Sequence, residues 1–153
     1  MLAPMRRLFL VLVTLAGCGV QPPPAAKKLE WVQPPAQGEV SAIVKSELER
    51  ARRDGHQLLV YVGATWCEPC QRFHRAAQAG KLDHAFGKLR LVEFDSDRDG
   101  ERLATAGYVS RLIPLFAAPG ADGRASGRQI EGSVKGDGAV DQIVPRLASL
   151  LEP

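Results

Sequence analysis

Two of the three cysteines in this 153-residue sequence lie three positions apart, at Cys67 and Cys70, in the stretch VGATWCEPCQRF. Two thiols at this spacing can act as a redox pair, supply half of the ligands of a zinc site, or close a small structural disulfide. The third cysteine, Cys18, lies far upstream. The chemistry of the pair therefore depends on the element that carries it and on the fate of Cys18.

The cysteine pair stands at the start of a predicted helix that runs from Pro69 to about Ala79. Proline suits the first helical turn, where its missing N–H would have no partner. A helix N-terminus carries roughly half a positive charge and free N–H groups, and both favour the thiolate, which is the reactive form of cysteine. We therefore expect Cys67 to be an activated nucleophile and Cys70, one turn further along, to be the resolving thiol.

Three other interpretations of the pair compete with this one. A structural zinc site needs four ligands, and the histidines His56, His74 and His84 show no paired ligand spacing, so we predict no metal site. Haem attachment needs a histidine directly after the second cysteine, where Gln71 stands. A structural disulfide fits an oxidising compartment, but so short a loop would constrain the unfolded chain little.

Residues 1–17 have the layout of a secretory signal peptide: a basic start, an apolar run too short for a permanent membrane helix, and then small residues. The stretch Leu15-Ala16-Gly17-Cys18 resembles the lipobox of bacterial lipoproteins. That resemblance implies that residues 1–17 are removed and that Cys18 becomes a lipidated N-terminus. We therefore expect an exported, membrane-anchored lipoprotein facing the periplasm or the cell exterior; a plain signal peptide with a chance cysteine is the alternative.

The mature chain is expected to be nearly neutral. Residues 1–17 hold two of the 20 Lys and Arg, which leaves 18 basic against 17 acidic side chains and a net charge of about +1. No basic stripe indicates a nucleic-acid partner. Residues 18–38 are rich in proline, which predicts an extended, semi-rigid tether whose Trp31 packs onto the domain. One domain, residues 39–153, follows.

Helical and strand patterns alternate along residues 39–153. An amphipathic helix begins near Glu39 and ends at Gly55, and the continuous apolar run 57–64 predicts a buried central strand directly before the cysteines. Further strands are predicted in LRLVEFDSD, LIPLFAAP and GRQIEGS, a short helical turn over 81–86, and helices over 99–106 and 137–151. Strands that alternate with helices predict a parallel sheet, and the late adjacent pair predicts an antiparallel hairpin at one side.

The segment LLVYVGATWCEPC resembles the strand-to-active-site segment of the thioredoxin family, with Trp66, Cys67, Pro69 and Cys70 on the family's W-C-x-P-C positions. The resemblance covers roughly residues 39–151. It implies an α/β, thioredoxin-like fold in which a central mixed four-stranded sheet is flanked by helices, preceded here by the signal peptide and the proline-rich tether.

Two later segments extend the resemblance. YVSRLIPLF is similar to the segment that holds the family's cis-proline, which puts that role on Pro114 and the substrate-facing backbone beside it on Ile113. GRASGRQIEGSVKGD is similar to the closing hairpin, with its glycine at Gly132.

The resemblance implies protein-disulfide reduction or thiol–disulfide exchange. Cys67 would attack a substrate disulfide, Cys70 would release the product, and Trp66 would shield the site or touch substrate. No Gly-rich dinucleotide motif follows a strand, so we expect no cofactor and electrons supplied by a partner dithiol. We expect a monomer acting on protein disulfides. A disulfide oxidant or isomerase, and a non-enzymatic binding module that keeps the fold, stay open.

Two residues depart from the family pattern. Tyr61 stands where thioredoxins carry a buried aspartate that helps move the resolving thiol's proton, and a tyrosine with a reference pKa of about 10 cannot do this near neutral pH. Glu68 places a carboxylate near Cys67, which should raise the pKa of that thiol and make the pair less oxidising. We therefore hypothesise a reductant or general exchanger. We expect His74 to be a solvated helix residue and not a base.

Overall fold

The structure, a computed structural model, describes residues 28–152, so the expected signal peptide, Cys18 and the first part of the tether lie outside the described residues. The strands are β1 (Glu30–Val32), β2 (Gln57–Gly63), β3 (Leu89–Asp95), β4 (Leu115–Pro119) and β5 (Ala125–Glu131). The helices are α1 (Val40–Asp54), α2 (Glu68–Gln78), α3 (Asp83–Phe86), α4 (Ser96–Thr105) and α5 (Gly138–Leu151).

The strands form one mixed sheet in the order β1-β3-β2-β4-β5. Strands β1 and β2 run parallel to β3, whereas β4 runs antiparallel to both β2 and β5. This confirms the predicted α/β class, with a parallel part and a late antiparallel hairpin at one side. It also puts β2, the strand that leads into the cysteine pair, in the centre of the sheet.

The sheet has five strands, one more than the four expected. The additional strand, β1, pairs with β3 from Glu30 opposite Arg90 to Val32 opposite Val92, and it comes from the segment assigned to the tether. Three residues are too few to show a strand period, and the prolines on either side predict a tether. The ring of Trp31 stacks on His74 at 4.1 Å, so the expected packing of this tryptophan onto the domain is confirmed.

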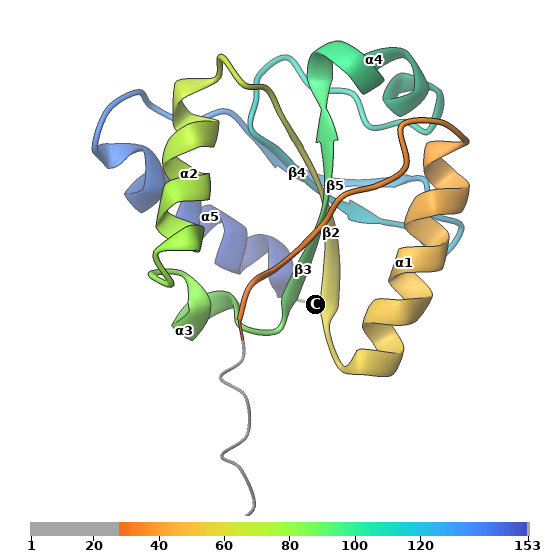
Figure 1. The fold of residues 1–153 in the computed structure, drawn as a ribbon, viewed down its shortest axis with the longest axis horizontal. Helices are drawn as coiled ribbons and strands as arrows, with labels where there is room; N and C mark the ends of the chain where they lie inside the picture. The colour runs from red at the N-terminus through yellow and green to blue at the C-terminus, as the bar shows by residue number, and fades with distance from the viewer. Residues whose placement is uncertain (1–27, 153) are drawn as a thin grey trace, which may run out of the picture.

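Strand β2 is buried from Leu58 to Gly63, its successive residues point to opposite faces of the sheet, and each face has its own core. Leu59 and Tyr61 pack with α2, α3 and α5, while Leu58, Val60 and Val62 pack with α1 and α4. Figure 1 shows these two helix layers on either side of the sheet. A strand buried on both faces explains the continuous apolar run, and it holds the turn that follows rigidly in place.

Candidate active site

The cysteine pair lies in the turn between β2 and α2. Cys67 is the N-cap of α2, and its Sγ accepts a hydrogen bond from the N–H of Cys70 at 3.3 Å. The two sulfurs are joined in a disulfide, and both cysteines are buried. Pro69 occupies the first turn of the helix, as the sequence predicts. The start of α2 therefore directs its unpaired N–H groups and positive dipole end at the sulfur of Cys67.

A second segment reaches the disulfide from β4. The Ile113–Pro114 peptide bond is cis, which confirms that expectation from the sequence. Val62 lies opposite Leu115 in the β2–β4 register, so Pro114 lies beside the turn that follows β2 and carries the cysteines. The carbonyl of Pro114 accepts a hydrogen bond from the N–H of Gly132 at 2.9 Å, which ties this segment to the end of β5.

Gly132 is the residue that lets these segments approach one another. Its φ is +66°, in the left-handed region, and a Cβ there would lie 2.9 Å from the Cβ of Leu112. Arg146 of α5 also donates a hydrogen bond to the Gly132 carbonyl at 2.8 Å. A side chain at this position would meet both backbone strain and a collision.

Gly132→Ala is expected to lower the free energy of unfolding by about 2–3 kcal/mol, because left-handed strain and overpacking each contribute on the order of 1 kcal/mol or more. Gly127→Ala is the matched control, because Gly127 also has a positive φ of +87° but has nothing within 4 Å of a Cβ. Urea unfolding of the two variants measures the difference. Equal losses would show that the contact with Leu112 contributes nothing.

Large apolar side chains are exposed at Trp66, directly before Cys67, and at three valine or leucine residues in later loops. The exposed fractions are 66% for Trp66, 61% for Val109, 60% for Leu112 and 47% for Val134. Trp66 and the 109–113 segment line a cavity of about 300 Å³. The indole N–H of Trp66 donates to the Asp97 carboxylate at 2.8 Å, which holds the ring in place. Exposed apolar groups gathered at one site are typical of a surface that binds another molecule.

Glu68, between the cysteines, is held by hydrogen bonds. Its carboxylate accepts from the Arg72 side chain and, at 3.2 Å, from the N–H of Gly136. Arg72 also pairs with Asp137 at 2.6 Å. The hydrogen bond from Arg72 lowers the pKa of Glu68, burial opposes this, and the Gly136 N–H adds to the lowering. The negative charge that we expected to act on Cys67 is therefore partly compensated by Arg72.

Tyr61 lies at the position where the family pattern has an acid. The side chain is fully buried, and its hydroxyl has no hydrogen-bond partner among the described residues. Burial, with a smaller contribution from Glu93, raises the pKa of Tyr61 well above its ordinary value. Tyr61 is therefore neutral at physiological pH and cannot accept a proton.

His74 differs from its prediction. We expected a solvated helix residue, but its Nε2 lies 2.7 Å from a carboxylate oxygen of Glu93, and its ring stacks on Trp31. Sequence reasoning did not identify Glu93, because a single acid within the apolar run of β3 gives no signal of a partner on α2. Of the other predicted site residues, Trp66, Cys67, Glu68, Pro69 and Cys70 share one turn, Ile113 and Pro114 lie beside it, and Cys18 is outside the described residues.

Within residues 28–152, no three His, Cys, Asp or Glu side chains are placed to hold a metal ion. A membrane-spanning helix is likewise not found in this described range, since none of its helices is both long and apolar enough.

A model of a thioredoxin-like family matches residues 41–117, which include the cysteine pair and the cis-proline. Comparison with curated proteins finds no match. Poplar thioredoxin h is 19% identical with a TM-score of 0.52, and the alignment covers 82% of this chain and 98% of that one. Thioredoxin O1 from Arabidopsis thaliana, in its oxidized state, is 15% identical with a TM-score of 0.50, covering 80% and 99% respectively. At these identities the two solved structures show a shared fold.

Proposed function

The chain belongs to the thioredoxin-like family, and from that premise we propose that it is a membrane-tethered, extracytoplasmic enzyme that reduces or exchanges disulfides of exported proteins. The family match and the Cys67–Cys70 disulfide support thiol–disulfide oxidoreductase activity itself. The observation that carries the proposal is the position of this disulfide, at the N-terminus of α2 and beside the cis-proline segment and exposed apolar side chains.

The reaction follows from this geometry. In the reduced protein, the thiolate of Cys67 attacks one sulfur of a substrate disulfide, and the other substrate sulfur leaves as a thiolate. The Cys70 thiol then loses its proton and attacks Cys67, which breaks the mixed disulfide, forms the Cys67–Cys70 bond and releases the second substrate thiol. Two protein thiols are oxidised while one substrate disulfide is reduced. A partner dithiol must afterwards reduce the protein again.

The exposed apolar side chains around the disulfide support a protein substrate. Trp66 and Leu112 both line the cavity next to the cysteine turn and are exposed. Pro114 has no N–H and its carbonyl is taken by Gly132, so in this proposal Ile113 supplies the backbone contacts of the segment and the apolar groups supply side-chain contacts. Such contacts tolerate many sequences, which suits an enzyme that acts on several disulfide proteins.

The point at which the chain enters the domain supports the tether. The N–H of Leu29 donates to Asp83 of α3 at 3.1 Å, and α3 follows the C-terminal end of α2. The disulfide lies at the other end of α2, which at 1.5 Å per residue is about 16 Å long. A lipid on Cys18 would therefore anchor the domain at the end remote from the disulfide and leave the site facing exported substrates.

The redox potential tests the direction of the reaction. We expect equilibration with glutathione to give a potential well below the value of about −120 mV that marks a strong periplasmic oxidant. A potential near −120 mV would instead indicate a disulfide donor.

Removing either of the two charges beside Cys67 should shift the redox potential, in opposite directions. Glu68→Gln makes the cysteine pair more oxidising, and Arg72→Gln, which leaves Glu68 uncompensated, makes it more reducing. Shifts of the same sign in both variants would refute the hypothesis that the Glu68 charge makes the cysteine pair less oxidising.

A further inference from the structure

We propose that the paired side chains of His74 and Glu93 accept, through solvent, the proton that the Cys70 thiol loses when it resolves the mixed disulfide. The inference rests on the proposed thiol exchange and names the groups that carry its proton. Cys70 is 2% exposed, and burial disfavours the charged form of a thiol. Because the thiolate is the attacking form, a proton acceptor within reach of this buried sulfur speeds the second step.

A cavity connects Cys70 with the pair. It has a volume of about 430 Å³ and lies between α2 and the C-terminal half of β3, and its lining includes Cys70, His74 and Glu93. The imidazole Nε2 and a carboxylate oxygen are 2.7 Å apart in this lining, with 28% and 22% of the two side chains exposed. The imidazole and the carboxylate can pass a proton between them, which suits the pair to accept one from a thiol.

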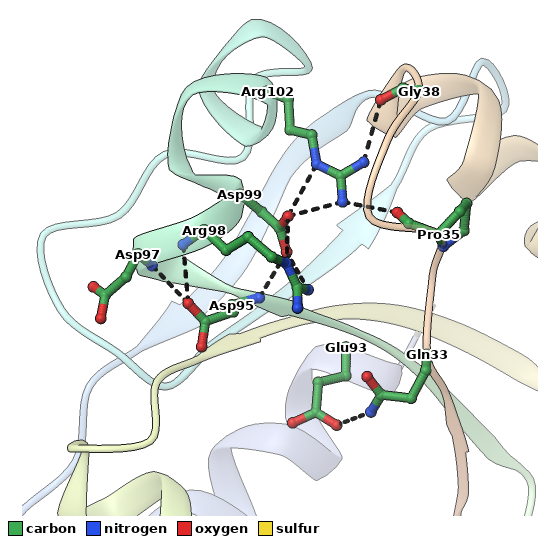
Figure 2. A network of polar contacts seen from close by, with 9 residues as sticks. All are labelled: Gln33, Pro35, Gly38, Glu93, Asp95, Asp97, Arg98, Asp99 and Arg102. Atoms are coloured by element: carbon green, nitrogen blue, oxygen red, sulfur yellow. Dashed lines mark hydrogen bonds and ion pairs between the residues drawn. The ribbon is translucent and has the colours of Figure 1, made fainter.

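Strand β1 holds the pair in position. The side-chain amide of Gln33, just after β1, donates to the second carboxylate oxygen of Glu93 at 2.5 Å, as Figure 2 shows. Trp31 of β1 stacks on the His74 ring, with 20° between the two ring planes. Contacts from β1 and the residue that follows it therefore fix the imidazole and the carboxylate.

Tyr61 lies beside the pair in the wall of this cavity. It stands opposite Glu93 in the β2–β3 register, and its ring meets the His74 ring edge-on, with 5.5 Å between the centroids. Its buried hydroxyl has no partner among residues 28–152, and a neutral phenol does not take up a proton. The pair next to Tyr61 therefore remains as the acceptor.

The other charged groups that line the cavity are unsuitable as the acceptor of the Cys70 proton. Arg75 and Arg98 carry guanidinium groups, which do not accept protons at any physiological pH. The carboxylate of Asp95 caps α4 by accepting from the N–H groups of Asp97 and Arg98, at 2.9 and 3.0 Å. His74 and Glu93 therefore remain as the proton-accepting pair among the cavity's described residues.

The two steps can be timed separately with an aromatic disulfide that releases a coloured thiol. Mixing 5,5′-dithiobis(2-nitrobenzoate) with the reduced protein in stopped flow gives one coloured thiolate when Cys67 attacks and a second when Cys70 closes the disulfide. In Glu93→Gln and His74→Gln, we expect the second phase to slow about tenfold or more, since a positioned base contributes up to several orders of magnitude and solvent replaces part of it. The first phase should change less than about twofold.

Gln78→Ala, at the far end of the same helix and cavity, is the matched control and should leave both phases unchanged. Two readouts exclude a merely structural role. The pH profile of the second phase should differ between the wild type and the two variants. Free imidazole should restore the second phase of His74→Ala.

The kinetic measurements distinguish a failure of this proton-transfer proposal from a failure of the proposed function. If the first phase is absent in the wild type, the proposed thiol exchange through Cys67 is contradicted, and proton transfer to His74 and Glu93 is contradicted with it. If the first phase is normal but the second phase is equally fast in both variants, or has the same pH profile in them as in the wild type, only proton transfer to His74 and Glu93 is overturned. The two substitutions lie on different elements, α2 and β3, so one variant decides the matter where the other impairs folding.

Discussion

Cys67→Ser is expected to reduce the dithiothreitol-driven reduction of insulin to the uncatalysed rate. A serine hydroxyl cannot form or receive a disulfide, and its oxygen remains protonated where the Cys67 sulfur ionises at the N-terminus of α2. Turbidity of the precipitating insulin chains measures the loss. Cys70 remains in this variant, but a single thiol cannot complete the exchange cycle, since no second cysteine resolves its mixed disulfide.

Cys70→Ala should behave differently from Cys67→Ser. It keeps the attacking sulfur but lacks the group that resolves the mixed disulfide, so it should accumulate covalent complexes with substrate that dithiothreitol releases. Mass spectrometry of complexes trapped in cells then identifies the partners, which share a disulfide and an accessible apolar segment if Trp66 and Leu112 contact them.

Cys18→Ser is the matched control for the loss of a cysteine. It should abolish membrane association while insulin reduction by the purified protein stays at the wild-type rate. Insulin reduction by the wild type that is no faster than the uncatalysed rate would contradict the proposed enzyme and favour a thioredoxin-like binding module, whereas full activity of Cys67→Ser would contradict the role of Cys67 as the attacking thiol. Membrane association unchanged in Cys18→Ser would contradict the lipid tether and leave the enzyme intact.

The cysteine pair could be predicted because everything that places it is local in the sequence. The buried strand, the turn and the helix that starts at Glu68 follow one another without a gap, and their patterns are strong. The cis bond before Pro114 depends on a distant segment, so the local sequence left both isomers open and only the resemblance to a family indicated cis. A site formed by one short segment can therefore be predicted from the sequence without a structure.

What the sequence could not show is contact between distant segments. Glu68 accepts a hydrogen bond from the N–H of Gly136, and His74 on α2 pairs with Glu93 on β3. Each of these pairs depends on the register of the sheet and on helix packing, which no local pattern encodes. Strand β1 was missed for the same reason, since its three residues form a strand only because β3 offers a free edge. These are also the contacts that distinguish this site from a generic cysteine pair.

Asp99→Asn is expected to cause the largest loss of stability among the single substitutions considered. Asp99 is 1% exposed, and its carboxylate accepts from the side chains of Arg98 and Arg102 and from the N–H of Asp95, at distances between 2.8 and 3.0 Å. Removing one partner of a buried ion pair costs about 3–5 kcal/mol, since the remaining charge loses its compensation. An amide of the same shape retains some of these contacts, so we expect a loss of about 3 kcal/mol.

The loss of stability in Asp99→Asn should also affect the segment that joins β1 to α1. Figure 2 shows Arg102 between Asp99 and this segment, where it donates to the carbonyls of Pro35 and Gly38 at 3.0 and 3.2 Å. Without the carboxylate, the guanidinium is no longer held toward these carbonyls. We therefore expect faster amide hydrogen exchange in residues 30–38 of Asp99→Asn, beyond the change that its lower global stability explains.

The pH dependence of stability gives the same carboxylate a second test. Burial by itself would raise the pKa of Asp99, but the hydrogen bonds from Arg98, Asp95 and Arg102 outweigh it, and the pKa lies below its ordinary value.

A carboxyl whose pKa is lowered on folding stabilises the protein fully above its unfolded pKa of about 3.9, and this contribution is lost as the pH falls through the folded value. As the pH falls below about 4, the wild type should therefore lose more stability in urea unfolding than Asp99→Asn, in which only other carboxyls with a lowered pKa, such as Glu68, still contribute. Glu101→Gln, which removes an exposed charge from the same helix, should follow the wild-type curve. Parallel curves for wild type and Asp99→Asn would mean that the charge of Asp99 contributes nothing to stability and that its role is packing alone.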